Sequence, residues 1–224
     1  MATSVMGSVV FLKIAEFARR SASEQARLRA QLEAVIAVVT AELAPASRLV
    51  LDAADGAAVV VLRNPAGALR VARRALNAAA AGLPLAAGLN HGALQVSGRK
   101  GGEGMTGDGI AVAANIAAFA DSSRVLASRA FREALADAAP GREAMLRPAG
   151  TFTDSGLRSH EVFTPDERGL ERRRHLYLAV AVALAIASIA GGLTWRAHEG
   201  RPPFVEVVVA KYTYLHGLVH RARN

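Results

Sequence analysis

The chain has 224 residues, of which 52% are hydrophobic but only 5% aromatic, so its core is expected to consist of Ala, Val and Leu rather than rings. It contains no cysteine, which excludes a disulfide framework, a thiolate metal site and a cysteine nucleophile. The formal net charge of +8 is spread along the chain, with only residues 172–174 forming a run of arginines and no aromatic residues between the charges, so no nucleic-acid partner is expected.

Hydrophobic patterns divide the first 165 residues into alternating strands and helices. Ser21 or Ser23 is the expected N-cap of the first helix. The predicted elements are a strand 9–12, a helix 23–43, two strands within 48–62 joined by an Asp-Gly turn at 54–56, a helix 65–80, two strands within 83–98 joined by a turn near 90–92, a helix 109–119, a strand 123–128, a helix 129–138 and a hairpin within 152–165. This order predicts an α+β fold in which helices cover one face of a mostly antiparallel sheet.

A glycine-rich stretch, residues 98–109, precedes the third predicted helix. Its glycines resemble those of a phosphate-binding loop, in which Arg99 and Lys100 would supply positive charge. It lacks the G-x-x-x-x-G-K-[ST] pattern, however, and does not join a strand to a helix as such loops do. We therefore expect a mobile connection, with Asp108 capping the helix that follows.

Residues 176–195 contain no charged side chain over 20 positions, which is the length of a helix that spans the hydrocarbon core of a bilayer. Four arginines (168 and 172–174) lie just before this stretch and two (196 and 201) just after it. Since arginines favour the inner side, and since residues 1–8 do not begin a signal peptide, a single-pass protein of the inner or plasma membrane is expected, with its N-terminal domain in the cytoplasm. Residues 165–175 would form a basic linker.

The last stretch, residues 196–224, would then be a short tail on the far side of the membrane. Pro202 and Pro203 break any helix there, and the β-branched residues that follow fit an extended strand, an interfacial segment or a disordered tail equally well. His216 and His220 are four residues apart and could share a helix face, but no metal pair is expected from this spacing alone.

Five segments of the first domain follow one another in the order and at the spacing of a known family. They are VVFLKIAEF (9–17), LDAADGAAVVVL (51–62), LAAGLNHGALQ (85–95), TGDGIAVAANIAAFADSSRVLAS (106–128) and GTFTDSGLRSHEVFTP (150–165). They resemble the F-x-D-I strand, the G-D-G hairpin, the G-I-N-x-G strand, the G-D-x-V-N-x-A-x-R helix and the closing hairpin of class III adenylate/guanylate cyclase catalytic domains. The resemblance covers residues 7–164 and implies the ferredoxin-like sandwich of that family.

The resemblance also implies a chemistry. In such domains the 3′-oxygen of ATP or GTP attacks the α-phosphorus of the same nucleotide and releases pyrophosphate. Two carboxylates of one subunit hold two divalent ions, Mg²⁺ or Mn²⁺, that bridge the attacking and leaving oxygens. An Asn and an Arg from the other subunit orient the ribose and stabilise the developing charge. A homodimer is therefore implied.

Most of the implied catalytic positions are replaced in this chain. The first metal carboxylate falls at Lys13 and the second at Asp55, which is present. An ammonium cannot ligate a metal ion, so a metal site at Asp55 would lack its second carboxylate. The alternative is a misaligned strand in which Glu16 supplies the missing ligand.

The second half of the implied site is also altered. The Asn and Arg positions fall at Ala111 and Asn115, so no intact catalytic residue is expected there. The adenine-selecting Lys falls near Leu51, which leaves ATP against GTP open. With an intact partner chain, each of the two composite sites of a dimer would still be damaged.

Two functions from different classes follow. The first is a membrane-anchored, catalytically impaired cyclase-homology domain that forms a homodimer or senses a nucleotide. In the sensing version Lys13, Gly56 and Asp108 would contact the nucleotide, with the ammonium standing in for a metal's charge; the alternative is that Lys13 only reaches solvent. The second is a divergent but active cyclase that uses Asp55 and Mg²⁺ or Mn²⁺.

Overall fold

The computed structural model describes residues 3–79, 82–99 and 102–166, together with positions 180, 182, 187 and 188. The chain divides into two compact units, Met1–Glu167 and Arg168–Asn224, and the fold described below is that of the first. Among the described residues, no helix is both long enough and apolar enough to cross a bilayer. The predicted linker, span and tail lie outside the described residues, apart from residues 165–166 and the four isolated positions.

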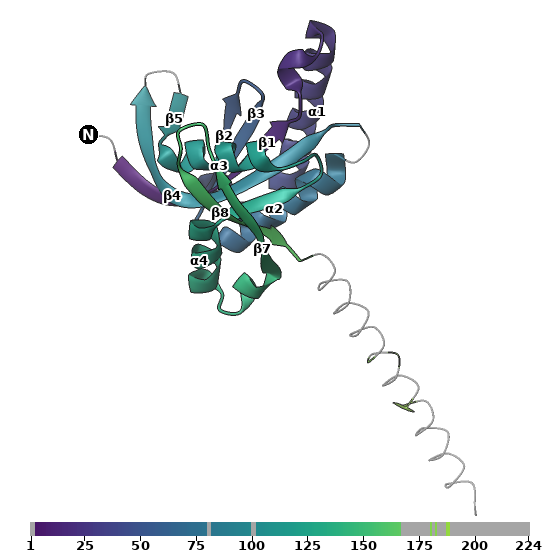
Figure 1. Cartoon of the computed structure of the whole chain (residues 1–224), viewed down its shortest axis with the longest axis vertical. Coiled ribbons are helices and arrows are strands. Elements are labelled where there is room, and N and C mark those ends of the chain that lie inside the picture. Colours follow the sequence, from purple (N-terminus) through teal and green to yellow (C-terminus); the bar gives the residue numbers. More distant parts are fainter. Residues whose placement is uncertain are drawn as a thin grey trace, which may run out of the picture. The chain divides into compact units, whose positions relative to one another are not determined.

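The first unit is an α+β sandwich, as the sequence predicts (Figure 1). Its helices are α1 (Ala22–Thr40), α2 (Pro65–Ala79), α3 (Asp108–Phe119) and α4 (Arg129–Ala138). Its strands are β1 (Thr3–Ile14), β2 (Arg48–Ala53), β3 (Gly56–Leu62), β4 (Leu85–Arg99), β5 (Gly102–Thr106), β6 (Val125–Ser128), β7 (Leu146–Thr153) and β8 (Ser159–Pro165).

One sheet joins all of these strands in the order β2-β3-β1-β4-β6-β8-β7, and β5 pairs with the far end of β4. Its neighbouring strands are antiparallel except for β4 and β6, which are parallel. The sheet is thus mostly antiparallel, as predicted. The long central strands β1 and β4 pair over twelve residues, from Thr3↔Val96 to Ile14↔Leu85.

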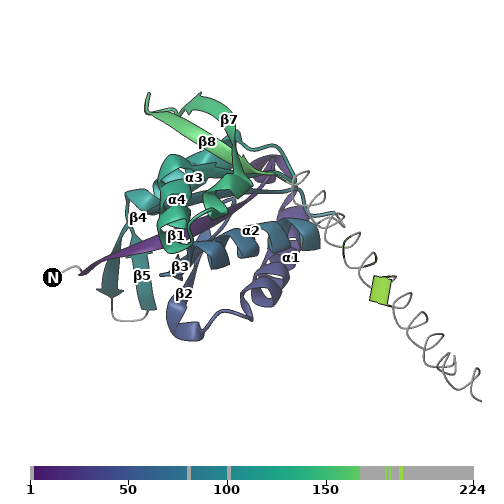
Figure 2. The same cartoon turned by 90° about the horizontal axis from the view of Figure 1, so that it is seen from below.

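Helices cover both faces of the sheet rather than one (Figures 1 and 2). Alternate side chains of β1 explain why, because Val10, Leu12 and Ile14 join a core with α1, α2 and α4, whereas Val9 and Phe11 join a second core with α3. A strand buried on both faces is a continuous apolar run, which is what the sequence contains here.

Two of the predicted connections are strands in the structure. Residues 90–92 lie within the uninterrupted strand β4, where Asn90, His91 and Gly92 pair with Val9, Ser8 and Gly7 of β1, so the predicted turn is wrong. The long-range pairing overrides the local turn signal. The stretch 98–109, expected to be a mobile connection, contains β5, which pairs antiparallel with β4.

The ends of two helices test the predicted caps. Ser21 is the N-cap of α1 and forms a capping box with Glu24, so this prediction is confirmed. Asp108, in contrast, does not cap α3: the N-cap is Gly107, with φ of 143°, and Asp108 is the first helical residue. Its carboxylate instead contacts Arg158, fifty residues further along the chain.

Candidate functional site

The structure brings Lys13 and Asp55 into direct contact. Lys13 lies at the end of β1, and Asp55 lies in the turn between β2 and β3. Lys13 Nζ is 2.6 Å from Asp55 Oδ2, and both side chains are about one-third exposed, at 31% and 35%. The two positions that the resemblance assigns to metal carboxylates are therefore adjacent, as that assignment requires, and they form an ion pair.

The backbone holds this pair in place. The amide of Ile14 donates a hydrogen bond to the carbonyl of Asp55 at 2.8 Å, and Lys13 pairs with Gly56 in the β1–β3 register. A Cβ at Gly56 would lie 2.0 Å from the carbonyl oxygen of Leu12, so only glycine fits there. Gly56, predicted to contact a nucleotide, thus packs against the backbone of β1.

Arg29 of α1 holds the hairpin turn from the other side, and sequence reasoning missed it. Its guanidinium donates hydrogen bonds to the carbonyls of Ala53 at 3.4 Å and Ala54 at 2.9 Å, and lies 5.2 Å from the centre of the Phe17 ring. Its partners are backbone carbonyls, so no residue pattern could have indicated this contact. The turn that carries Asp55 is fixed between β1 and α1.

Glu16, the alternative ligand, lies beyond the end of β1. It has a left-handed backbone conformation, with φ of 56°, and its carboxylate pairs with Arg19 at 3.3 Å and Arg20 at 3.9 Å. Lys13, not Glu16, meets Asp55. Among the described residues, no three His, Asp or Glu side chains are grouped closely enough to hold a metal ion. At the two positions that the resemblance assigns to metal carboxylates, the donors present are one carboxylate and one ammonium, which only donates hydrogen bonds, so this pair does not fit a two-metal site.

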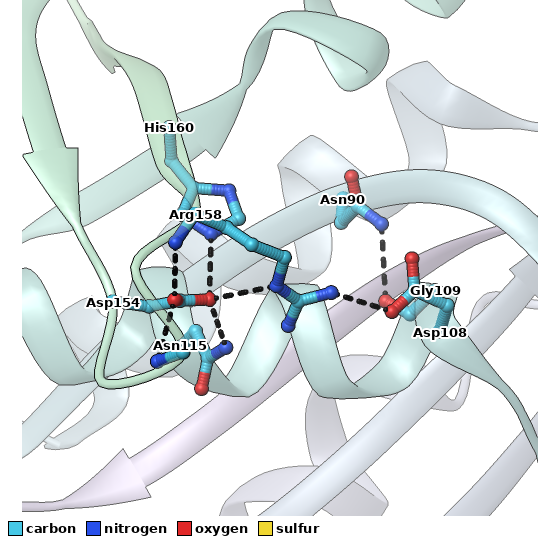
Figure 3. A network of polar contacts seen from close by, with 8 residues as sticks. Asn90, Asp108, Gly109, Asn115, Asp154, Arg158 and His160 are labelled. Carbon is cyan, nitrogen blue, oxygen red and sulfur yellow. Dashed lines mark hydrogen bonds and ion pairs between the residues drawn. The ribbon is translucent and has the colours of Figure 1, made fainter.

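The second half of the implied site lies on α3. Ala111 is exposed and has no functional group, and Asn115 is half-buried. The Asn115 amide donates a hydrogen bond to Asp154 Oδ2 at 3.0 Å, so it is engaged within its own chain (Figure 3). The side chain at the implied Arg position is thus bonded to the turn between β7 and β8.

Asp154 is the centre of a polar network that the sequence did not indicate in full (Figure 3). Its carboxylate, 3% exposed, accepts hydrogen bonds from the backbone amides of Gly156 and Arg158, both at 2.9 Å, and lies 3.0 Å from Nε2 of His160. The His160 contact, followed by the Arg158 amide, holds the pKa of Asp154 well below its usual range. The Asp-Ser-Gly turn is a local signal for the Gly156 bond, but not for the contacts across the fold.

Arg158 extends this network to the start of α3. Its Nε lies 3.1 Å from Asp154 Oδ2, and its Nη1 lies 3.0 Å from Asp108 Oδ1. Asp108, predicted to contact a nucleotide, is thus ion-paired, although its side chain is 76% exposed. The β7–β8 hairpin thus contacts both halves of α3, through the ion pair of Arg158 with Asp108 and the hydrogen bond from Asn115 to Asp154.

A cavity of about 530 Å³ opens beside this network, between β4, β8 and the N-termini of α3 and α4. At its base Asn90 donates to the carbonyl of Gly109 at 3.1 Å and accepts from Ser128 Oγ at 2.7 Å. His91 lies 3.0 Å from Ser8 Oγ, and burial lowers the pKa of His91. Of the residues predicted to contact a nucleotide or metal, only Asp108 lines this cavity; Lys13, Asp55, Ala111 and Asn115 do not.

No protein-family model and no curated protein sequence matches the chain. Solved structures do match it. The guanylate cyclase domain of RhGC from Catenaria anguillulae, in complex with GTP, has a TM-score of 0.58 at 13% identity over 73% of this chain and 98% of its own. The adenylyl cyclase CyaB from P. aeruginosa has 0.57 at 13% identity, over 75% and 96%. A non-canonical dimeric guanylyl cyclase domain of the RhoGC fusion protein from Blastocladiella emersonii has 0.57 at 12% identity, over 74% and 98%.

Proposed function

We propose that this chain, which has the fold of adenylate and guanylate cyclase catalytic domains, is a catalytically impaired member of that group that acts as a membrane-anchored, dimerising regulatory module. The observation that carries the proposal is the 2.6 Å contact between Lys13 Nζ and Asp55 Oδ2. The position of one metal carboxylate is occupied by a cation, and the remaining carboxylate is paired with it. Two-metal phosphoryl chemistry needs both carboxylates.

The α3 side supports the same proposal. Ala111 offers no group to orient a ribose, and the amide of Asn115 carries no charge and is bound to Asp154. Transition-state stabilisation needs a donor aimed at the developing charge, and removing one such donor typically costs about 10²–10³ in rate. Since each half of the site is altered, an intact partner chain would restore neither composite site.

Dimerisation is supported by an apolar face of the sheet. Helix α3 packs over β1, β4 and β6, whereas no described helix packs extensively over β2 and β3 on that side. The side chains there are hydrophobic and only partly buried: Leu49, Leu51, Ala53 and Leu62. A second copy of the chain would complete their burial, and the domain from Blastocladiella emersonii is itself described as dimeric. Confinement to a membrane would raise the local concentration and favour such a pair.

Nucleotide sensing is the second candidate role. Lys13 provides a positive charge at the end of β1, and the neighbour from Catenaria anguillulae was solved with GTP. Against this, the charge of Lys13 is balanced by Asp55, and Gly56 and Asp108 are engaged within the fold. The dimerising role therefore has the stronger support.

The test is cyclic nucleotide production by the full chain in vesicles, with ATP and GTP in turn and with Mg²⁺ or Mn²⁺. We expect no product above that of an Asp55→Ala control. Product that disappears in the control would establish the alternative, a divergent cyclase that uses Asp55. Crosslinking in the same vesicles measures dimer formation independently of turnover.

A further inference from the structure

We propose that the Lys13 ammonium is a resident cation that takes the place of a divalent metal ion in this fold. It joins the end of β1 to the β2–β3 hairpin, so that the domain neither needs nor binds Mg²⁺ or Mn²⁺ at Asp55. This inference concerns the site discussed above, but it does not rest on the absence of cyclase activity, because it is a statement about metal binding.

The geometry shows a bridge of the kind that a metal ion would make. The Asp55 carboxylate contacts the end of β1 through the Lys13 ammonium, with 2.6 Å between Oδ2 and Nζ. The Ile14–Asp55 backbone hydrogen bond on one side and the two Arg29 hydrogen bonds on the other hold the turn in this position. A carboxylate on a fixed turn, facing one fixed strand end, has little freedom to reach another partner.

Electrostatics then disfavours a metal ion. A divalent ion at Asp55 would lie near the ammonium, and at about 4 Å in water this repulsion alone weakens binding about 30-fold. The ion would also have one carboxylate ligand where such sites supply two. Replacing Lys13 by Asp reverses both effects. The charge change alone corresponds to about 1,000-fold in affinity at that distance, which salt screening reduces to on the order of 100-fold.

The experiment measures Mn²⁺ binding to the full chain in detergent, from the loss of the electron paramagnetic resonance signal of free Mn²⁺. Four proteins are compared with the wild type: Lys13→Asp, Asp55→Asn, the double variant Lys13→Asp/Asp55→Asn, and Arg124→Asp as a control. Arg124 pairs with Asp121 at 3.4 Å on the surface, so the control makes the same charge change and also places two carboxylates close together.

We expect no Mn²⁺ binding by the wild type that depends on Asp55, and on the order of 100-fold tighter binding by Lys13→Asp. The double variant, which keeps one carboxylate instead of two, should lose most of this gain. Arg124→Asp measures what the same charge change contributes at an exposed pair on the surface, and its gain should be clearly smaller than that of Lys13→Asp. Saturable wild-type binding that Asp55→Asn abolishes would overturn the proposal, and so would a folded Lys13→Asp protein with no gain. If Lys13→Asp folds only with Mn²⁺, its thermal unfolding transition appears only when Mn²⁺ is added, and this itself shows the gain in metal binding. The comparison of Mn²⁺ binding by the wild type and by Asp55→Asn then tests the proposal without that variant. Metal binding and product formation are separate readouts, so failure here is distinguishable from failure of the proposed function.

Discussion

Ser128 links three elements around the 530 Å³ cavity, and its removal should destabilise the domain more than the loss of a helix cap. Its hydroxyl accepts a hydrogen bond from the Phe131 amide at 3.0 Å, which caps α4, and donates one to Asn90 Oδ1 at 2.7 Å. Asn90 in turn holds the Gly109 carbonyl of α3. Ser128 and Asn90 are 6% and 5% exposed, so most of each residue is shielded from bulk solvent.

The expected cost of Ser128→Ala has two parts. Loss of the cap costs about 1 kcal/mol. The Asn90 oxygen is left buried without a donor, which costs about 1–3 kcal/mol more. The free energy of unfolding should therefore fall by about 2–4 kcal/mol. Ser21→Ala is the matched control, because Ser21 caps the exposed start of α1 and has no buried partner. That change should cost only about 1 kcal/mol.

Urea unfolding of the unit Met1–Glu167 measures both changes. The midpoint should fall at constant slope, since a change in slope would mean that the variants differ in compactness as well as in stability. Ser128→Thr, which keeps the hydroxyl, should recover most of the loss. If Ser128→Ala costs no more than Ser21→Ala, the buried link between Ser128 and Asn90 does not stabilise α3 and α4, and the reasoning is refuted.

Two further predictions concern α3 and its hairpin. A Cβ at Gly88 would lie 2.1 Å from the Ala113 carbonyl oxygen, so Gly88→Ala should displace α3 and cost more than about 2 kcal/mol in urea unfolding. Gly92→Ala in the same strand meets nothing closer than 3.5 Å and should be nearly neutral; equal costs would contradict the close packing. Folding lowers the pKa of the Asp154 carboxyl from 3.8. The ionised carboxylate therefore contributes its full stabilisation to the folded state above about pH 3.8, and this contribution declines as the pH falls further. Wild type and Asp154→Asn should therefore converge in stability toward acid pH, and a constant difference in their urea midpoints between about pH 7 and about pH 2 would count against this.

The order of the elements was predictable because each carries its own local signal. The apolar runs of β1 and β3 need burial on both faces, and the Asp-Gly turn between β2 and β3 follows from backbone preferences. The predicted bounds 129–138 for α4 agree with the structure because Ser128 is an N-cap and the helix has an amphipathic pattern. The resemblance to cyclase domains assigned Lys13 and Asp55 to the two metal-carboxylate positions, which implied that they lie side by side.

What the sequence did not predict depends on partners far along the chain. The turn expected at residues 90–92 is absent because β1 supplies partners for that whole stretch. Asp108 does not cap α3 because Arg158, fifty residues later, binds its carboxylate. Asp154 shows only a turn signal in the sequence, whereas its burial depends on the meeting of α3 and the β7–β8 hairpin. No local pattern carries this information.

The altered positions are physically consistent with one another. Lys13 balances the charge of Asp55 inside its own chain, and on our proposal the site therefore offers little attraction to a metal–triphosphate complex. An arginine at position 115 would then lack the phosphate that it stabilises, whereas an asparagine satisfies Asp154 without adding a charge to α3. On the proposed function, restoring one position alone should therefore not restore turnover. Lys13→Asp should recover metal affinity while Ala111 and Asn115 still prevent catalysis, so metal binding without product is the combination that would support both proposals together.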